Sequence, residues 1–258
     1  QGPRNEGLFY KEAVEKSYYA FRKLGLDVDV IDMEQDISEY KIVAIPMLYM
    51  FREGFEKKVE QFVKNGGTAG MTYWAGIVDE TDLCYLGGTP HGLMGVFGLR
   101  STEIDALYDH EENYIVPVKE SSIHLSSQWK CKNLCDLVKV STAEICGVYG
   151  EDFYQGYPAL TRNAYGEGKA YYICADFEQG FYDEVISKIV DLTNIKKPVK
   201  VIPNGVEVTT RKSEQNEYIF IQNYNNHEVD IELENAKIIL GEYEKGKIQK
   251  FETIVMIK

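Results

Sequence analysis

The chain has 258 residues and an acidic excess, with 41 Asp and Glu against 28 Lys and Arg and a formal net charge of −13. This balance excludes nonspecific nucleic-acid binding and docking on anionic lipid, because both need a basic surface. No apolar run approaches the roughly 20 residues that span a bilayer. Five cysteines in no regular framework indicate a reduced, cytoplasmic protein, and the 19 tyrosines are typical of interfaces or sugar contacts.

The first predicted elements are a helix and a strand. Gln1–Gly7 shows no periodicity, whereas Leu8–Lys23 carries apolar residues at helical spacing and stops at Gly25. The alternating stretch Leu26–Ile31 predicts a strand. A doubly wound sheet normally begins with a strand rather than with a loop and a helix, so we expect a further strand upstream of Gln1; the alternative is a sheet that starts at its second strand by design.

The stretch from Tyr40 to Glu80 predicts a βαβ unit around which the rest is organised. Lys41–Leu48 is an almost unbroken apolar run, which suits a strand buried on both faces. Thr68–Tyr73 returns as a second strand, parallel to the first. Function in such sheets usually lies at the carboxyl ends of strands, which here means the loop from Trp74 to Glu80. The helix between the strands has an apolar stripe and a glycine-rich stop: Phe55, Val59, Phe62, Val63 and Asn65-Gly66-Gly67.

Beyond Glu80 the glycine-rich chain predicts mostly loop, with a short helix near Pro90–Phe97 and a longer one over Gly180–Thr193. Gly166 marks a hairpin turn between the last two of five short strands. Together these elements predict a doubly wound α/β domain over residues 1–197, with helices on both faces of its sheet. The five strands are Asn113–Val118, Asp136–Val140, Glu144–Tyr149, Ala159–Ala164 and Lys169–Cys174.

The pattern changes to strands alone after Lys196-Lys197-Pro198, which is the best linker candidate. Turn residues separate these strands, so residues 198–258 predict a small antiparallel β-sandwich close to the lower size limit for an independent fold. Its predicted strands are Val206–Arg211, Tyr218–Asn223, Val229–Leu233, Ala236–Leu240 and Lys250–Ile257.

Two enzymatic interpretations of a doubly wound sheet find little support. No G-x-G-x-x-G follows a strand and opens a helix, so dinucleotide binding fails. A cysteine nucleophile needs an exposed thiol on a sharp strand-to-helix turn. The turn after Lys41–Leu48 holds Tyr49-Met50-Phe51 instead, and Cys84, Cys146 and Cys174 are interpreted as structural thiols.

A metal site is the third interpretation, and it rests on a thin set of ligands. Cys131 and Cys135 lie four residues apart, with Cys146 downstream and His110 and His124 nearby in sequence only. Zinc sites usually draw their ligands from closer pairs. We therefore expect neither a metal nor another cofactor.

The loop after the second strand carries adjacent carboxylates and a tryptophan. Glycoside hydrolysis needs two carboxyl groups that face each other across the bond, whereas adjacent side chains such as those of Asp79 and Glu80 diverge. We expect these two to bind backbone, an arginine or another subunit. Trp74 has three interpretations that stay open: an interface anchor, a stacking face for a sugar ring, or a buried core residue.

Several segments, taken together and in order, resemble one family. GIVDE and PALTRNAYGEGKAYY are the specific signals. The chain thereby resembles the trimerisation and C-terminal β domains of the β-galactosidases of glycoside hydrolase family 42. The full set of resembling segments is LDVDVID, YKIVAIPMLYM, NGGTAGMTYWAGIVDETDL, LGGTPHGLMGVFGL, EIDAL, YPALTRNAYGEGKAYY and NGVEVTTR.

The resemblance implies a flavodoxin-like fold, similar to class I glutamine amidotransferases without their nucleophile. It implies that the two catalytic glutamates belong to a (β/α)₈ barrel, and this chain is too short to hold such a barrel of about 250 residues together with the two domains that it resembles. It implies a homotrimer in which this domain lies near the active site of a neighbour, where a β-galactoside binds. The residues that the resemblance assigns to an interface or an active-site wall are Tyr73, Trp74, Gly76, Ile77, Val78, Asp79 and Glu80.

Three functional hypotheses follow. The first is a non-catalytic assembly portion of a β-galactosidase that hydrolyses terminal β-galactosides by the retaining route. The second is a stand-alone sugar-binding or assembly protein of the same fold, in which galactose would quench Trp74 or Trp129. The third is a divergent amidotransferase-like enzyme, which would need one unusually reactive cysteine.

Overall fold

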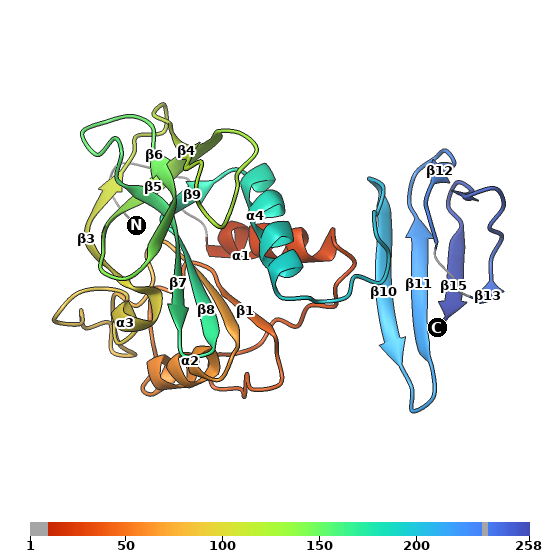
Figure 1. Ribbon diagram of the computed structural model, residues 1–258, viewed down its shortest axis with the longest axis horizontal. Coiled ribbons are helices and arrows are strands. Elements are labelled where there is room, and N and C mark those ends of the chain that lie inside the picture. Colours follow the sequence, from red (N-terminus) through yellow and green to blue (C-terminus); the bar gives the residue numbers. More distant parts are fainter. Residues whose placement is uncertain (1–9, 234–236) are drawn as a thin grey trace. The chain divides into compact units, whose positions relative to one another are not determined.

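The computed structural model describes residues 10–233 and 237–258, which form two compact units (Figure 1). The first unit comprises the described residues up to Ser17 together with Ile31–Ile189, and the second comprises Tyr18–Val30 together with Val190–Lys258. The predictions for Gln1–Gly7, for the start of the first helix and for Ala236 lie outside the described residues. No helix among the described residues is long and apolar enough to cross a membrane.

A nine-stranded mixed sheet is the centre of the first unit, in the order β1-β2-β8-β7-β6-β4-β5-β3, with β9 paired to β5. The pairings of β1 with β2 and of β2 with β8 are parallel, whereas the other pairings among this sheet's described strands are antiparallel. The predicted α/β class is confirmed. The strands are β1 Ile42–Ile45, β2 Thr68–Thr72, β3 Leu99–Ala106, β4 Asn113–Pro117, β5 Trp129–Val140, β6 Glu144–Tyr149, β7 Pro158–Tyr165, β8 Gly168–Ile173 and β9 Ala175–Phe177.

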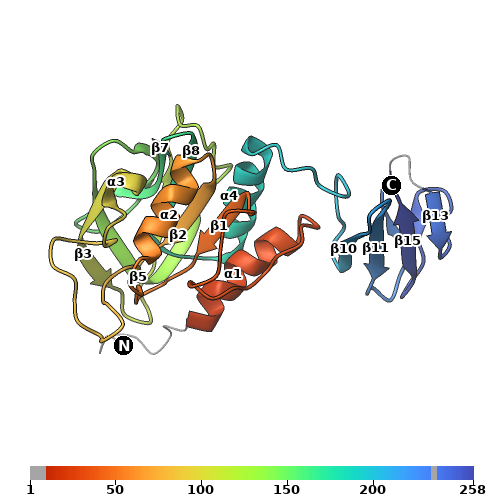
Figure 2. The same cartoon turned by 90° about the horizontal axis from the view of Figure 1, so that it is seen from below.

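In the described part of the chain, four helices accompany this sheet: α1 Tyr10–Arg22, α2 Phe55–Lys64, α3 Met94–Phe97 and α4 Gln179–Leu192. Helix α2 packs on β2 and β8, and α3 packs on β3, β7 and β8. Helices α1 and α4 lie side by side, apart from α2 and α3 (Figures 1 and 2), and Gln179 Nε2 donates to the carbonyl oxygen of Lys16 at 3.0 Å. The predicted apolar stripe of α2 is confirmed, because all four of its residues are buried: Phe55, Val59, Phe62 and Val63.

The predicted βαβ unit is confirmed as β1, α2 and β2 with parallel strands. The prediction that its first strand is buried on both faces is wrong. Strand β1 lies at the end of the described sheet and pairs with β2 alone. Ala44 is therefore exposed, and Ile42 and Val43 are half-buried. An apolar run identified the strand correctly but not its position in the sheet.

The predicted strand over Leu26–Ile31 is also wrong. The segment is irregular and pairs with no described strand. Its polar groups contact other partners: Arg22 donates to the carbonyl oxygen of Leu26 at 3.0 Å, and the Asp27 carboxylate accepts from the Thr210 N–H at 3.3 Å. Val30 is 74% exposed. Alternation predicts a half-buried strand only where a neighbouring strand exists to pair with it.

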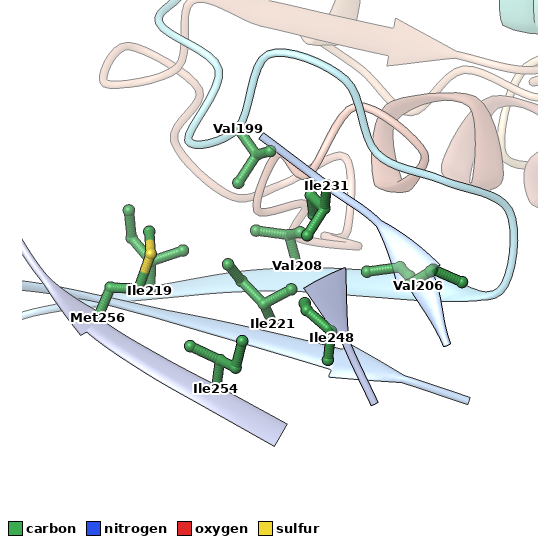
Figure 3. Close-up of a cluster of buried hydrophobic side chains, with 10 residues drawn as sticks. Val199, Val206, Val208, Ile219, Ile221, Ile231, Ile248, Ile254 and Met256 are labelled. Carbon is green, nitrogen blue, oxygen red and sulfur yellow. The ribbon is translucent and has the colours of Figure 1, made fainter. Parts of the chain in front are cut away.

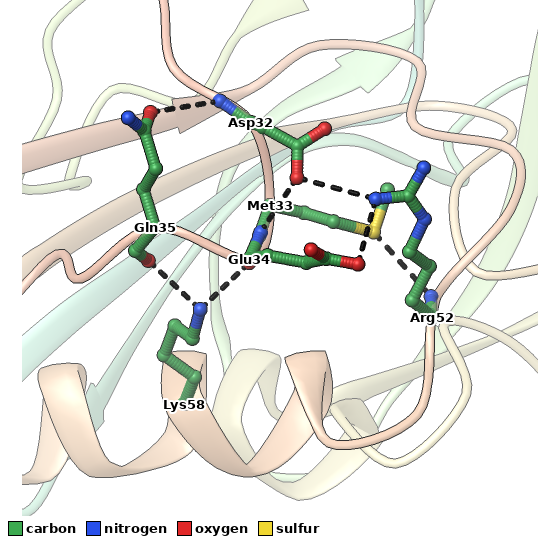
Figure 4. A network of polar contacts seen from close by, with 6 residues as sticks. All are labelled: Asp32, Met33, Glu34, Gln35, Arg52 and Lys58. Carbon is green, nitrogen blue, oxygen red and sulfur yellow. Dashed lines mark hydrogen bonds and ion pairs between the residues drawn. The ribbon is translucent and has the colours of Figure 1, made fainter.

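The next segment, from Asp32 to Gln35, is anchored beside the start of α2 (Figure 4). The Arg52 guanidinium lies 3.3 Å from the carboxylate of Asp32 and 2.9 Å from that of Glu34. Lys58 donates to two backbone carbonyl groups of the segment, at 2.7 and 2.8 Å. Exposed ion pairs contribute little stability, so this network fixes the course of the chain more than it stabilises the fold.

Further along the first unit, the predicted short helix is confirmed as α3, the longer helix as α4, and the five short strands correspond to β4–β8. The antiparallel hairpin of β7 and β8 forms at Gly166 as predicted. Sequence patterning missed β3, β9 and the first half of β5. Strand β3 was interpreted as loop because its sequence, LRSTEIDA, is polar at both alternating positions.

The described strands of the second unit form two antiparallel sheets, β10-β11-β15-β13 and β12-β14. Aliphatic side chains from both sheets meet in one core (Figure 3), which includes Val208, Ile221, Ile248 and Ile254. The predicted all-antiparallel organisation is confirmed, while the short β14 was not predicted. The strands are β10 Val206–Lys212, β11 Glu217–Asn223, β12 Val229–Asp230, β13 Lys237–Leu240, β14 Lys247–Ile248 and β15 Thr253–Ile257.

Candidate functional site

The carboxyl ends of the parallel strands β1, β2 and β8 lie next to one another in the sheet. Met47 follows β1 with φ 43°, and Trp74 follows β2 with φ 52°. Both are non-glycine residues in the left-handed region, which is uncommon and costs free energy. Backbone strain of this kind clusters at binding and catalytic sites. We therefore take this end of the sheet as the candidate functional site.

Hydrogen bonds hold the two strained residues in place. The Met47 N–H donates to the Thr72 hydroxyl at 2.7 Å, which ties the turn after β1 to the end of β2. The Gly76 N–H donates to the carbonyl oxygen of Leu48 at 2.9 Å. Met47 and Tyr73 are buried in a small apolar cluster, with Trp74 packed against its edge. The two turns thus form one unit with a fixed backbone.

A buried carboxyl group lies beneath the second turn. Asp136 Oδ2 accepts hydrogen bonds from the Trp74 N–H at 3.2 Å and from the Tyr172 hydroxyl at 2.7 Å. Asp136 Oδ1 is buried without a hydrogen-bond partner among the described residues. Burial raises the pKa of Asp136 to about 6, because the charged form loses its hydration. This aspartate positions the Trp74 backbone, and it was missed as a site residue because it begins a predicted strand.

An ion pair ties α1 to the same end of the sheet. Lys16 Nζ lies 2.5 Å from Asp176 Oδ1, and the two side chains are only 23% and 11% exposed. Lys16 also donates to the carbonyl oxygen of Phe177 at 2.8 Å, and Asn133 Nδ2 donates to Asp176 Oδ2 at 2.7 Å. The charges are therefore fully engaged with each other and with neighbouring groups. This cluster was not predicted, since its members lie far apart in the sequence.

The predicted site residues lie on one loop, but they do not all face outward. Tyr73 and Val78 are each 1% exposed, and Gly76 is buried. The half-buried members are Trp74, Ile77 and Asp79, and Glu80 is exposed. The Trp74 ring packs edge-to-face on Tyr49, with ring centroids 5.2 Å apart. Trp74 is thus a partly exposed residue rather than a fully buried core tryptophan.

The two carboxylates of the loop are not arranged as an acid–base pair. Asp79 Oδ1 accepts from the Thr81 N–H at 2.8 Å, from the Thr81 hydroxyl at 2.7 Å and from the Leu83 N–H at 3.1 Å. These bonds, the one from the Thr81 hydroxyl above all, lower the pKa of Asp79. A general acid needs the opposite shift. The expectation that this carboxylate binds backbone is confirmed for Asp79.

Four of the five cysteines are buried, and Cys84 is exposed. Burial raises the pKa of Cys146 to about 12 and that of Cys174 well above its ordinary value. The Sγ atoms of Cys131 and Cys135 lie 3.9 Å apart, and their contact, together with burial, raises the pKa of Cys131. Within the described ranges, no three or more His, Cys, Asp or Glu residues gather where they could hold a metal ion.

Two protein-family models match the chain. A model described as the β-galactosidase trimerisation domain matches residues 1–196, and one described as the β-galactosidase C-terminal domain matches residues 205–256. The two matches are consecutive and together span most of the sequence.

Curated relatives show the same similarity. β-Galactosidase Pbg of Clostridium perfringens is 41% identical over 239 residues, which are 92% of this chain and 35% of the relative. β-Galactosidase BgaA of Planococcus sp. is 41% identical over 253 residues, which are 97% of this chain and 37% of the relative. The chain thus spans little more than a third of the length of these relatives.

Solved structures agree with the sequence comparisons. A β-galactosidase from Rahnella sp. R3 superposes with a TM-score of 0.93 at 35% identity, covering 100% of this chain and 38% of that one. A β-galactosidase from Bacillus circulans sp. alkalophilus superposes with a TM-score of 0.92 at 34% identity, with the same coverage. Both describe similarity to one portion of a longer enzyme.

Proposed function

This chain belongs to the β-galactosidases of glycoside hydrolase family 42, and on that premise we propose that it is the non-catalytic assembly portion of such an enzyme. The match of residues 1–196 to the trimerisation domain carries the proposal. The coverage of 35% and 37% of two relatives supports it, because most of a relative's length has no counterpart here.

The hydrolysis of terminal β-galactosides is proposed for the whole enzyme, and we assign none of its steps to a described residue of this chain. Retaining hydrolysis needs two carboxyl groups about 5 Å apart that face the same bond. Asp79 is engaged by its own loop, and Asp136 is buried beneath Trp74. Neither carboxylate is placed to act on a sugar.

Assembly into a homotrimer is the proposed role of the first unit, and the loop from Tyr73 to Glu80 is its proposed contact. Tyr73, Gly76 and Val78 are buried within the chain, so they shape the loop from inside. A neighbouring subunit, or a galactoside bound at its edge, would meet Trp74 and the residues that follow. A half-buried aromatic pair at a strand end suits either contact.

The proposed domain boundary lies between Lys197 and Pro198. It is supported by the two family models, which end at residue 196 and begin at residue 205. The proposed location is the cytoplasm, and the five free cysteines support it, since reducing compartments keep thiols unpaired.

Two measurements test this function. Incubating the chain with an aryl β-galactoside should give no turnover, because the proposed catalytic groups lie outside it; clear hydrolysis would contradict the non-catalytic assignment. Sedimentation equilibrium should give a mass of three chains, as a closed ring of identical subunits requires. A mass of one chain would contradict the assembly role.

A further inference from the structure

The turn from Thr81 to Gly88, here called the leucine loop, presents two strongly exposed aliphatic side chains. Leu83 is 67% exposed and Leu86 is 93% exposed. One exposed leucine on a protein surface is ordinary. Two within four residues of chain, on the same loop, leave an apolar tip in water at an energetic cost that a partner would remove.

Hydrogen bonds and one ring-stacking contact with neighbouring residues hold the leucine loop in a fixed conformation. The Asp79 N–H donates to the carbonyl oxygen of Leu83 at 3.0 Å, and the Asp79 carboxylate accepts from the Leu83 N–H at 3.1 Å. On the other side, the Tyr85 hydroxyl donates to the carbonyl oxygen of Phe51 at 3.1 Å, and the Tyr85 ring stacks on His91 with centroids 3.6 Å apart. A braced loop loses little conformational entropy when it binds, so its leucines are preorganised.

The leucine loop is continuous with the proposed assembly contact at Trp74. Val78 forms an isolated β-bridge with Met50, in the turn after β1, and another with Cys84, in the leucine loop. Backbone pairing therefore links the leucine loop to that turn through Val78. The Tyr49 hydroxyl donates to the Asp82 carboxylate at 3.3 Å, and the Tyr49 ring packs against Trp74. Tyr49 thus connects Trp74 directly to the loop that carries the exposed leucines.

We propose that the leucine loop is the principal apolar anchor between copies of this chain, with Leu83 and Leu86 inserting into an apolar surface of the next copy. The identity of the occupant rests on the proposed function, through the match to a trimerisation domain. An apolar centre ringed by polar groups is the arrangement of an interface hot spot, and Glu80 and Asp82 supply exposed polar groups here.

The loop meets a different surface of the next copy, not a second leucine loop. Three copies close into a ring through head-to-tail contacts, in which the two sides of each contact differ. A loop-to-loop contact would also place the Glu80 and Asp82 carboxylates of one copy against the same carboxylates of the other. These like charges repel each other, and the chain already carries a net charge of −13. The receiving surface is therefore apolar, with lysine or arginine side chains at its rim.

The test replaces both leucines in the full 258-residue chain, as Leu83→Ser with Leu86→Ser. Sedimentation should show the dissociation constant of the trimer rising by at least about tenfold, since such anchors carry much of the binding free energy. The matched control is Leu240→Ser, which makes the same change at a leucine that is 60% exposed on β13. Its assembly should equal that of the wild type, and circular dichroism verifies the fold of each variant.

Cys84 provides a second readout, because it lies beside Leu83 and is the exposed cysteine while the other four are buried. Maleimide labelling of Cys84 should be slow in the wild-type trimer and fast on dilution or in the double leucine variant. A wild-type trimer that labels rapidly and survives both substitutions overturns the inference and leaves the proposed function standing. A wild-type chain that stays monomeric overturns the proposed function, and the inference with it.

Discussion

The backbone N–H of Trp74 donates a hydrogen bond, 3.2 Å long, to the carboxylate of Asp136, a residue from the strand β5. Trp74 holds a left-handed backbone with φ 52°, which a side chain of its size seldom adopts. The bond offsets part of that strain and places a carboxyl group beneath the proposed assembly contact. The burial of that carboxyl group raises its pKa to about 6, so its ionisation near neutral pH changes the free energy of unfolding.

Replacing Asp136 with asparagine should change how the free energy of unfolding depends on pH. The pKa of Asp136 is raised from 3.8 to about 6 in the folded chain, so the stability this carboxyl contributes is complete below about pH 4 and is lost as pH rises through 6. An asparagine cannot ionise and keeps its contribution at every pH. As pH rises through this range, the free energy of unfolding of the variant should therefore increase relative to that of the wild type by up to about 3 kcal/mol. Urea unfolding between pH 4 and 8 measures the difference.

Asp152→Asn is the matched control for that experiment, because Asp152 is exposed. It makes the same Asp-to-Asn change at the surface, so it should not reproduce the gain that Asp136→Asn shows between pH 4 and 8. A difference between Asp136→Asn and the wild type that stays constant from pH 4 to 8 would show that Asp136 does not titrate in this window.

Replacing Gly76 with alanine should destabilise the turn after β2. Gly76 has φ 61°, and a Cβ atom there would lie 2.7 Å from the Phe51 ring and 2.9 Å from the backbone nitrogen of His91. Strain and overpacking together predict a loss of at least about 2 kcal/mol in the free energy of unfolding. Gly95→Ala in α3 is the control, because no described atom other than those of its chain neighbours and its own helix backbone lies within 4 Å of the new Cβ position. This control should leave stability unchanged or higher, since alanine favours a helix more than glycine does.

Replacing Lys16 with methionine should destabilise the fold, because it leaves the largely buried carboxylate of Asp176 without its ion-pair partner. Removing one partner of a largely buried ion pair costs on the order of 3 kcal/mol. Adding Asp176→Asn should recover part of this loss, because it removes the unpaired charge. Lys11→Met breaks the exposed pair with Glu15, at 3.5 Å, and should change stability by less than about 0.5 kcal/mol. Equal effects of the two lysine substitutions in thermal or urea unfolding would argue against a structural role for the Lys16 pair.

A Cys84→Ser variant should present no reactive thiol in the folded state. Its four remaining cysteines are buried, and for Cys146 and Cys174 burial also raises the pKa. Titration with a disulfide reagent should therefore detect nothing until denaturant is added, and all four thiols afterwards. A thiol that reacts rapidly in the folded variant would support the amidotransferase-like hypothesis for one of these four cysteines, since activated cysteines react as thiolates.

Patterning predicted the βαβ core well because its signals are local. The stripe of α2 repeats at helical spacing, and the apolar runs of β1 and β2 are bounded by turn residues. The same reasoning predicted a strand at Leu26–Ile31, where alternation is present but no described strand lies alongside. It also placed β1 in the interior of the sheet, because an apolar run does not reveal how many neighbours a strand has.

The candidate site was predictable in position but not in chemistry. The rule that function lies at the carboxyl ends of parallel strands pointed to Trp74. The left-handed backbone of Trp74 has no local signal, since glycine or asparagine normally marks such a position. The role of Asp136 depends on tertiary contacts with Trp74 and Tyr172, and the exposure of Leu83 and Leu86 within a glycine-rich stretch has no periodic pattern.

The mass of the 258-residue chain in solution tests the central claim most directly. Sedimentation equilibrium at neutral pH, over a range of concentrations, should show a species of three chains that dissociates on dilution. A chain that remains a monomer at the highest concentration measured would contradict the proposal that it is the assembly portion of a family 42 β-galactosidase.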